Sequence, residues 1–252
     1  MEITPAVKQL LLINVMIYIG TNFFGNTAMF YDLLSLHYFQ NLDFRWWQPL
    51  THFFMHAPSP NLSHILFNMF GLFSFGTALE QMWGSKKFVI FYMICGLGAG
   101  LIHSLVNYYQ FTDALNILVS NGFQKSDIFQ ILSEGKEYTA WREMLSVSDY
   151  KDFMNAYIGT AVGASGAIYG IMVAFAFMMP NAALSLIFLP IPIKAKFFVP
   201  IIVAFDLFSG VTGYSIFGGG NIAHFAHVGG AIFGFILVWL WRNNKFQHKR
   251  WN

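Results

Sequence analysis

The sequence predicts an all-α polytopic membrane protein, folded as a bundle of six transmembrane helices with the N and C termini in the cytoplasm. Only 10 % of its 252 residues are charged, whereas 56 % are hydrophobic. Soluble domains carry about 25 % charged residues, so a chain with this composition cannot cover a water-exposed surface. Apolar segments of about 20 residues, the length that a spanning helix needs, recur along the chain. These observations place the protein in a lipid bilayer.

Residues 1–252 are treated as a single membrane domain. The segments with the length and composition of spanning helices are residues 7–24, 61–79, 87–108, 156–179, 197–215 and 220–242. The first lacks an A-x-A cleavage site, so we interpret it as a retained helix. The apolar stretch 182–193 contains Pro190 and Pro192 and is predicted to be an interfacial or loop element.

The basic residues of the loops predict the orientation in the membrane. With an even number of spans both termini lie on one side, and the short loops and termini of that side hold Lys8, Lys86, Lys87, Lys194, Lys196, Arg242, Lys245, Lys249 and Arg250. The opposite side holds Arg45 and four basic residues within one long insert, which count little in this rule. The charge bias therefore predicts cytoplasmic termini in a plasma (inner) membrane protein.

Residues 109–155 form a long insert on the extracytoplasmic side. This insert carries most of the acidic residues of the chain, and Asp127 is a candidate helix N-cap. We predict a small amphipathic helical cap outside the membrane. It is either a substrate-facing lid or a solvated decoration, and the sequence favours neither.

Several polar residues lie within the predicted spans, where they are costly. Ser165 lies in the stretch "GASGAIYG" (163–170), and glycines 159, 163, 166 and 170 form one helical stripe. His227 shares a similar small-residue face of the sixth span, while His64 and Asn68 share a face of the second. At about 1.5 Å per residue, Ser165, His227 and Asn68 lie roughly 10 Å from the outer ends of their helices. The polar residues therefore converge on one layer.

This layer has the residue types of nucleophilic catalysis. Ser165 would attack a carbonyl carbon after His227 takes its proton. The Asn68 amide and the His64 imidazole would donate to the resulting oxyanion, and Gly163 leaves room for a peptide carbonyl. We expect Asp206 to lie deeper than His227, which favours a Ser–His dyad over a triad.

Other chemistries fit the sequence less well. The pairs His52/His56 and His224/His227 have ligand-like spacing, but H-E-x-x-H is absent and we expect no carboxylate at their depth. We therefore predict neither a metal nor another cofactor. The few basic residues are scattered, which excludes nucleic acid as a partner.

The chain resembles the rhomboid family of intramembrane serine proteases. The motifs "HILFN" (64–68), "GASG" (163–166) and "AHVGG" (226–230) carry the resemblance, which extends over residues 46–242 apart from the insert. It implies a six-helix bundle with a water-filled cavity open to the outside. It also implies that Ser165 is the nucleophile and His227 the base, with Tyr169 stacked against His227. An oxyanion hole would be formed by His64, Asn68 and the Ser165 backbone N–H.

Two features depart from the family pattern. The family often has Trp-Arg shortly before the Thr-His of its first outer loop, whereas this chain has Trp47-Gln48, with Arg45 nearby. The loop that holds residues 109–155 is usually short in the family. The first departure puts an arginine anchor of the loop in doubt.

We therefore expect an intramembrane serine endopeptidase whose substrates are transmembrane proteins and whose site faces the extracytoplasmic side. The alternative is a non-catalytic rhomboid-fold protein that binds membrane clients. A transporter is disfavoured because Asp206 is the one charged residue near the midplane of the predicted spans.

Overall fold

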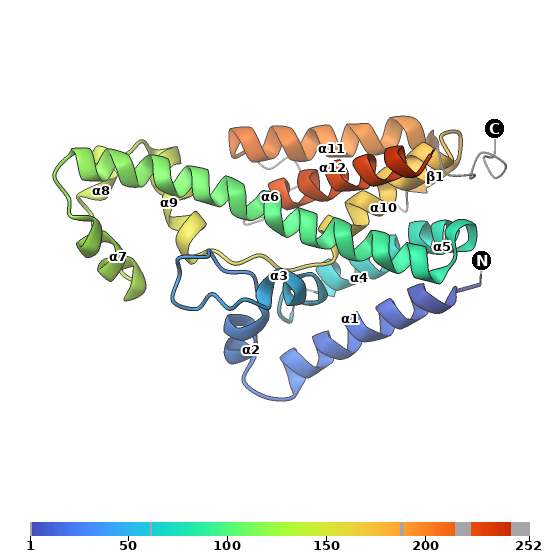
Figure 1. Ribbon diagram of the computed structural model, residues 1–252, viewed down its shortest axis with the longest axis horizontal. Helices are drawn as coiled ribbons and strands as arrows, with labels where there is room; N and C mark the ends of the chain where they lie inside the picture. Colours follow the sequence, from blue (N-terminus) through green and yellow to red (C-terminus); the bar gives the residue numbers. More distant parts are fainter. Residues whose placement is uncertain (1, 61, 187–188, 215–222, 243–252) are drawn as a thin grey trace.

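The computed structural model describes residues 2–60, 62–186, 189–214 and 223–242, and these residues are mostly helical (Figure 1). Within this part of the chain, five helical segments are long and apolar enough to cross a membrane: Pro5–Phe23, Leu62–Trp83, Ser85–Ser120, Ala195–Thr212 and His224–Trp241. A shorter apolar helix, Ser165–Met178, lies among them. The chain is therefore a multi-pass membrane protein.

The first half of the chain holds the helices α1 (Pro5–Phe23), α2 (Thr27–Leu34), α3 (Gln48–Thr51), η1 (His52–Phe54), α4 (Leu62–Gly71), η2 (Leu72–Gly76) and α5 (Thr77–Trp83). The second half holds α6 (Ser85–Ser120), α7 (Lys125–Ser133), α8 (Trp141–Met144), α9 (Val147–Ile158), α10 (Ser165–Met178), α11 (Ala195–Thr212) and α12 (His224–Trp241). The π-turn η2 joins α4 and α5 into one membrane segment.

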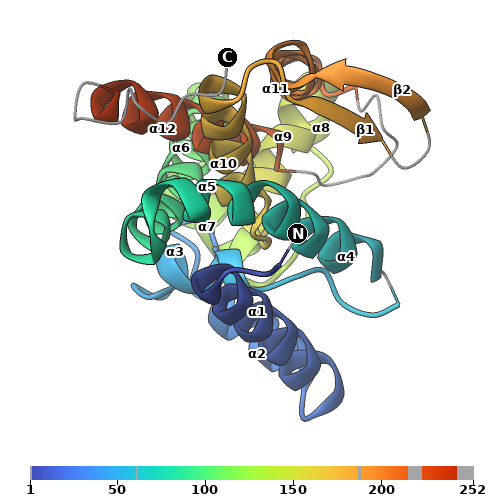
Figure 2. The ribbon, with the colours of Figure 1, turned by 90° about the vertical axis from the view of Figure 1, so that its right-hand side faces the viewer.

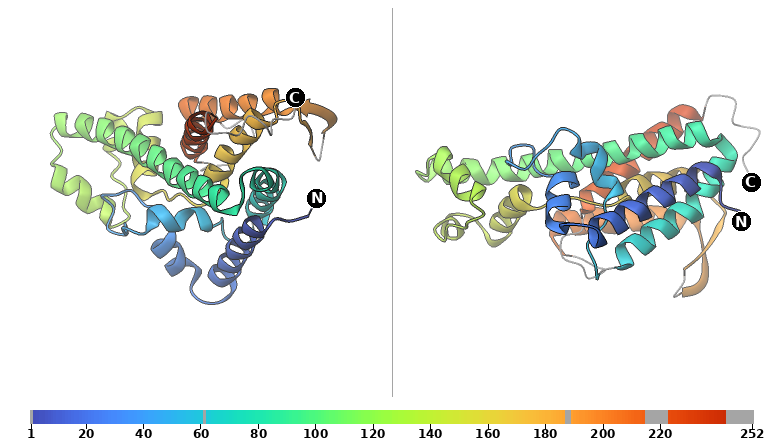
Figure 3. Two further views of the ribbon diagram at one scale, coloured as in Figure 1. Left: turned by 45° about the vertical axis from the view of Figure 1, so that its right-hand side comes forward. Right: turned by 90° about the horizontal axis from the view of Figure 1, so that it is seen from below.

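The centre of the molecule is formed by α6, α10 and α12, each of which packs against the other two. The helices α1 and α11 lie on opposite sides of this centre (Figures 1 and 3). Glycines allow α10 and α12 to touch through their backbones: a Cβ atom on Gly230 would lie 1.8 Å from the Gly166 carbonyl oxygen, and one on Gly234 would lie 2.5 Å from Gly170 Cα. Close packing through small residues is a common way for helices to associate in membranes.

The predicted fourth span is not a single helix. The helix α9 ends at Ile158 and α10 begins only at Ser165. Gly159 has extended backbone, and Gly163 has a φ of 124°, which lies outside the helical range. Only Gly166 and Gly170 of the expected stripe therefore belong to a helical face. The stripe was wrong at Gly159 and Gly163 because backbone conformation interrupts the apparent periodicity.

A small β-hairpin also departs from the all-α expectation. Strands β1 (Ala183–Leu186) and β2 (Leu189–Lys194) pair in antiparallel fashion between α10 and α11. They occupy the proline-containing stretch that the sequence predicts as an interfacial or loop element. The hairpin projects from the end of the molecule opposite to the insert (Figures 2 and 3).

The insert is helical, and its buried side chains form a second core cluster that Tyr38 of the first outer loop joins. The helix α6 does not stop at residue 108 but continues to Ser120, so that its last turns belong to the insert (Figure 1). Buried side chains from α6, α7, α8 and α9 pack together, with Trp141 and Phe153 fully buried among them. Phe111 stacks on Phe153 with ring centroids 4.9 Å apart. The cap is thus a packed unit on a rigid helical stem.

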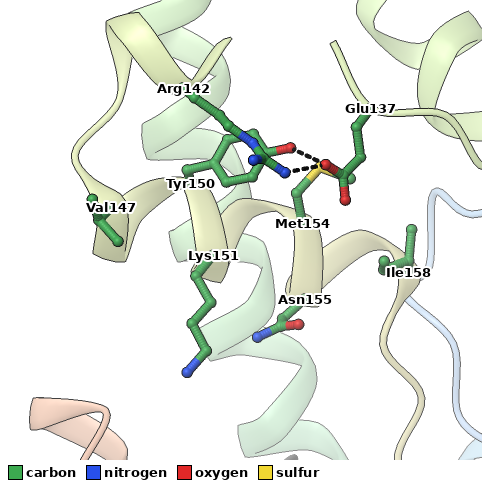
Figure 4. A pocket seen from close by; sticks show the side chains of 8 residues that line it. All are labelled: Glu137, Arg142, Val147, Tyr150, Lys151, Met154, Asn155 and Ile158. Carbon is green, nitrogen blue, oxygen red and sulfur yellow. Dashed lines mark hydrogen bonds and ion pairs between the residues drawn. The ribbon is translucent and has the colours of Figure 1, made fainter. Parts of the chain in front are cut away.

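A groove runs along α9 in this insert (Figure 4). Lys151 and Ile158 line it, together with a polar cluster in which Tyr150 Oη and Arg142 Nη2 donate to Glu137 Oε2 at 3.0 and 2.5 Å. These hydrogen bonds, from Tyr150 and then from Arg142, hold the pKa of the exposed Glu137 carboxyl below its usual value. All of its lining residues belong to the insert except Ile158, the last residue of α9.

The first outer loop is anchored by Gln48, which is fully buried. Its Nε2 donates to the carbonyl oxygens of Asp32 (3.0 Å) and Asp43 (2.9 Å), and its Oε1 accepts from the His37 backbone N–H (3.3 Å). The exposed Arg45 instead donates to the nearby carbonyls of Leu42 and Phe44. A neutral amide therefore anchors this loop without an arginine.

The N-terminal helix is held by a carboxylate from α5. Glu80 is buried and accepts from the backbone N–H groups of Ala6 and Val7, each at 2.8 Å, and from the hydroxyls of Thr4 and Ser85. The first N–H groups of a helix have no partner within the helix, and the N-terminal end of its dipole favours an anion. Glu80 satisfies both requirements from a distant part of the chain.

Glu80→Ala is expected to destabilise the protein because it leaves the Ala6 and Val7 N–H groups buried without partners. The expected loss is about 2–4 kcal/mol in the free energy of unfolding, measured by denaturant titration in detergent. Glu2→Ala removes an exposed carboxylate from the same end of the chain and is the matched control. Equal stability of the two variants would contradict the anchoring role.

Gln48→Ala is expected to loosen the first outer loop, since it leaves two carbonyls and one N–H without their partner. The expected cost is about 1–3 kcal/mol, and hydrogen exchange should rise at residues 32–48. Gln40→Ala, at an exposed position of the same loop, should change neither quantity. Unchanged exchange in Gln48→Ala would show that the amide is not the anchor.

Candidate active site

Ser165 lies where an extended segment enters a helix. The segment is tied down by a bridge between Ala161 and Leu36 and by a hydrogen bond from the Gly163 N–H to the His52 carbonyl at 3.0 Å. Ser165 is the first residue of α10. Its N–H is therefore among the helix-terminal donors that have no partner within the helix, at the end of the dipole that favours negative charge.

Ser165 and His227 meet through the packed faces of α10 and α12. The distance from Ser165 Oγ to His227 Nε2 is 2.7 Å, which is a hydrogen bond. Tyr169, one turn beyond Ser165, stacks on His227 with ring centroids 4.3 Å apart and an angle of 11° between the planes. Both Ser165 and His227 are only partly buried. The structure thus brings together these three residues as the sequence predicts.

Asp206 of α11 also reaches this pair, contrary to the sequence-based expectation. Its Oδ1 lies 3.1 Å from His227 Nδ1 and 2.6 Å from His224 Nδ1, and its Oδ2 accepts from the Tyr169 hydroxyl. The expectation that Asp206 lies deeper than His227, which favoured a Ser–His dyad over a triad, was therefore wrong. The prediction that no carboxylate lies at the depth of His224 and His227 was wrong for the same reason.

The depth of Asp206 was predicted wrongly because its helix ends earlier than the predicted span. The predicted span 197–215 places Asp206 at its middle, but α11 ends at Thr212, with Gly213 in the left-handed conformation. Asp206 then lies only about 9 Å from the outer end of the helix, near the layer of Ser165. The sequence indicates His224 only through its metal-like spacing from His227, although the i, i+3 relation places both residues on one helical face.

His64 presents its Nε2 atom to the same site. Its Nδ1 accepts a hydrogen bond from the Ala57 backbone N–H at 3.0 Å, so the proton of the neutral ring is on Nε2. A Cβ atom built on Gly163 would lie 2.8 Å from His64 Nε2 and 3.6 Å from Ser165 Oγ. The imidazole donor and the serine hydroxyl thus face a common space that exists because residue 163 has no side chain.

Asn68 lies one turn further along α4 than His64 and is buried. Its Nδ2 donates to the His64 carbonyl at 2.7 Å, which uses one of the two amide N–H groups. The amide carries a second N–H group. Among the described residues, Asn68 and Ser165 form no direct hydrogen bond with one another.

The carboxylate of Asp206 and the imidazoles of His224 and His227 could also hold a metal ion, since their ligand atoms lie within 4.8 Å of one another. The same atoms satisfy one another by hydrogen bonds. The other predicted histidine pair has a different environment. His52 Nδ1 lies 3.0 Å from the Gln48 carbonyl oxygen, and the buried His56 ring lies 5.3 Å from the His64 ring.

The fold and the site together define a multi-pass membrane protein with a Ser–His pair at the interface of two apolar helices. The rhomboid domain family model matches residues 43–244. The chain therefore belongs to the rhomboid family.

Curated relatives are similar at low identity. The chain is 26 % identical over 235 residues to Rhomboid-like protein 11, chloroplastic, of Arabidopsis thaliana, a match that covers 92 % of this chain and 63 % of the relative. It is 26 % identical over 204 residues to Rhomboid protease AarA of Providencia stuartii (76 % and 54 % covered). It is 26 % identical over 198 residues to Presenilin-associated rhomboid-like protein, mitochondrial, of Rattus norvegicus (76 % and 39 %). The chain thus spans 39 to 63 % of the length of these relatives.

Gly163→Ala is expected to slow the reaction of Ser165 with a fluorophosphonate by roughly 10- to 100-fold, because the methyl group displaces His64 from the shared space. The rate of labelling measures this effect. Gly122→Ala is the matched control: Gly122 also has a positive φ, of 96°, but a Cβ there would meet nothing within 4 Å. Equal labelling rates in the two variants would contradict the proposed geometry.

Proposed function

We propose that this protein is an intramembrane serine endopeptidase that cleaves the transmembrane segments of membrane proteins. The observation that carries the proposal is the 2.7 Å hydrogen bond between Ser165 Oγ and His227 Nε2 at a helix interface. A relative named as a rhomboid protease adds support. Hydrolysis of a peptide bond by this arrangement needs no cofactor.

Acylation begins with attack of Ser165 Oγ on the carbonyl carbon of the scissile peptide bond. The hydroxyl proton passes to His227 Nε2 as the new C–O bond forms. The tetrahedral intermediate then collapses, the C–N bond breaks, and Nε2 returns the proton to the leaving nitrogen. The products of this half are a new amino terminus and an ester on Ser165.

Deacylation repeats these steps with water. His227 Nε2 takes a proton from a water molecule as its oxygen attacks the ester carbonyl carbon. The second intermediate collapses, the bond to Ser165 Oγ breaks, and the proton passes from Nε2 to Oγ. The carboxyl product leaves and the resting hydroxyl is restored. The partial exposure of Ser165 and His227 is compatible with the entry of water.

The oxyanion of each intermediate would be held by donors from separate elements. His64 Nε2–H faces the space beside Gly163, and the Ser165 N–H is a free donor at the start of α10. We assign the second amide N–H of Asn68 to the same task. Donors held in place before the reaction stabilise developing charge without reorganisation.

In the membrane we assign six spans, of which α10 is the fourth along the chain, and cytoplasmic termini. Figure 1 shows the start of α1 and the end of α12 at one end of the molecule and the insert at the other, which agrees with an even number of crossings. The basic residues of the short loops indicate that the end with the start of α1 and the end of α12 lies in the cytoplasm. The site then faces the extracytoplasmic side of the plasma membrane, toward the insert.

The test is cleavage of a reporter protein with a single transmembrane segment by the purified chain in liposomes. Ser165→Ala and His227→Ala should each lower the rate by at least roughly 10³-fold, and a fluorophosphonate should label the wild type but neither variant. Ser74→Ala, which removes a serine from another span, is the control and should retain cleavage and labelling.

Two results would contradict this proposal. Labelling of Ser165→Ala at the wild-type level would show that another residue is the nucleophile. Reporter binding without cleavage by the wild type would favour a non-catalytic membrane-client binder.

A further inference from the structure

We propose that Asp206 is a positioning residue of this site, which holds the His227 ring in the tautomer and orientation that accept the Ser165 proton. The inference rests on the proposed hydrolysis and extends the Ser–His pair to a Ser–His–Asp triad. It also assigns to Tyr169 and His224 the task of holding the carboxylate in place.

The contacts form a continuous chain across three helices. Ser165 of α10 bonds to His227 of α12, and the opposite ring nitrogen of His227 lies 3.1 Å from Asp206 Oδ1 of α11. The carboxylate is buried, and α11 packs against both α10 and α12. Each nitrogen of the His227 ring therefore has its own partner. Nε2 faces the Ser165 hydroxyl, which carries a proton, and Nδ1 faces the Asp206 carboxylate, which can only accept one.

The chemistry of a carboxylate determines the tautomer. An ionised carboxylate has no proton to donate, so His227 Nδ1 must carry the hydrogen in this contact. In the neutral ring Nε2 then keeps its lone pair, which faces the Ser165 hydroxyl. Without the acid, the other tautomer would place a hydrogen on Nε2, where it cannot accept a proton. The carboxylate also lies beside the positive charge that His227 acquires when Ser165 attacks.

Tyr169 and His224 supply two further hydrogen bonds to the Asp206 carboxylate. The Tyr169 hydroxyl donates to Oδ2, while the His224 Nδ1 lies 2.6 Å from Oδ1. A carboxylate among apolar helices is costly unless it is paired and hydrogen-bonded. Asp206 has donors on both carboxylate oxygens, and one of these donors is the His227 ring, as a positioning role requires.

A kinetic experiment separates this role from packing. In the purified full chain, Asp206→Asn should lower kcat by roughly 10²- to 10⁴-fold and leave KM within about twofold, because no substrate contact is removed. Asp206→Glu, which restores a carboxylate, should recover part of the lost kcat. Asp32→Asn makes the same chemical change at an exposed site of α2 and should behave as wild type.

A spectroscopic experiment tests the same contact without hydrolysis. In Ser165→Ala protein labelled with ¹⁵N-histidine, the His227 Nδ1–H should give a downfield proton resonance typical of a hydrogen bond to a carboxylate. His227→Ala and Asp206→Asn should each remove it, whereas Asp32→Asn, at the exposed site of α2, should leave it in place. This measurement needs only folded protein.

The outcomes keep the two proposals distinct. Absence of reporter cleavage by the wild type, with the resonance present, would reject the proposed function and leave the Asp206 contact standing. Wild-type cleavage with kcat of Asp206→Asn within threefold would overturn the positioning role. Loss of activity on chelation with recovery on addition of zinc, together with a resonance that is seen only after the metal is removed, would also overturn it in favour of a metal held by these residues, because a metal-bound Nδ1 carries no hydrogen.

Discussion

The contact between the glycine faces of α10 and α12 is the constraint on which the rest of the site depends. A single methyl group on Gly230 would fall on the Gly166 carbonyl, so only hydrogen at these positions lets the two backbones approach. That approach sets the distance between Ser165 and His227, which belong to the same two helices. Membrane helices gain little from the hydrophobic effect between themselves, so such packing supplies much of their association.

The polar residues of the site form a connected chain of hydrogen bonds, which offsets the cost of placing them among apolar helices. Ser165, His227, Asp206, His224 and Tyr169 satisfy one another through direct contacts. Glu80 and Gln48 show the same principle, since each of these buried side chains forms hydrogen bonds with several backbone groups from distant segments. Each of these groups is costly only when its partner is missing.

The structure places most of the predicted residues near one another because their motifs lie on helical faces of fixed period. His64 and Asn68 share a face of α4, and Tyr169 follows Ser165 by one turn of α10. Gly163 was expected to leave room beside Ser165, and it does, but through a positive φ rather than as part of a helical stripe. Asp206 was missed because a composition-based span sets its ends only to within about a turn.

Composition and apolar segment length by themselves determined that this chain lies in a membrane and roughly where its spans run, since lipid accepts only backbones that satisfy their own hydrogen bonds. They also identified Ser165 and His227 as residues without a reason to be in apolar helices. Only the tertiary structure decided that α10 begins at Ser165, that α6 runs on into the insert, and that Asp206 faces His227. These three features depend on where each helix ends and how it is rotated about its axis. Packing against other helices sets both, so the local sequence does not predict them.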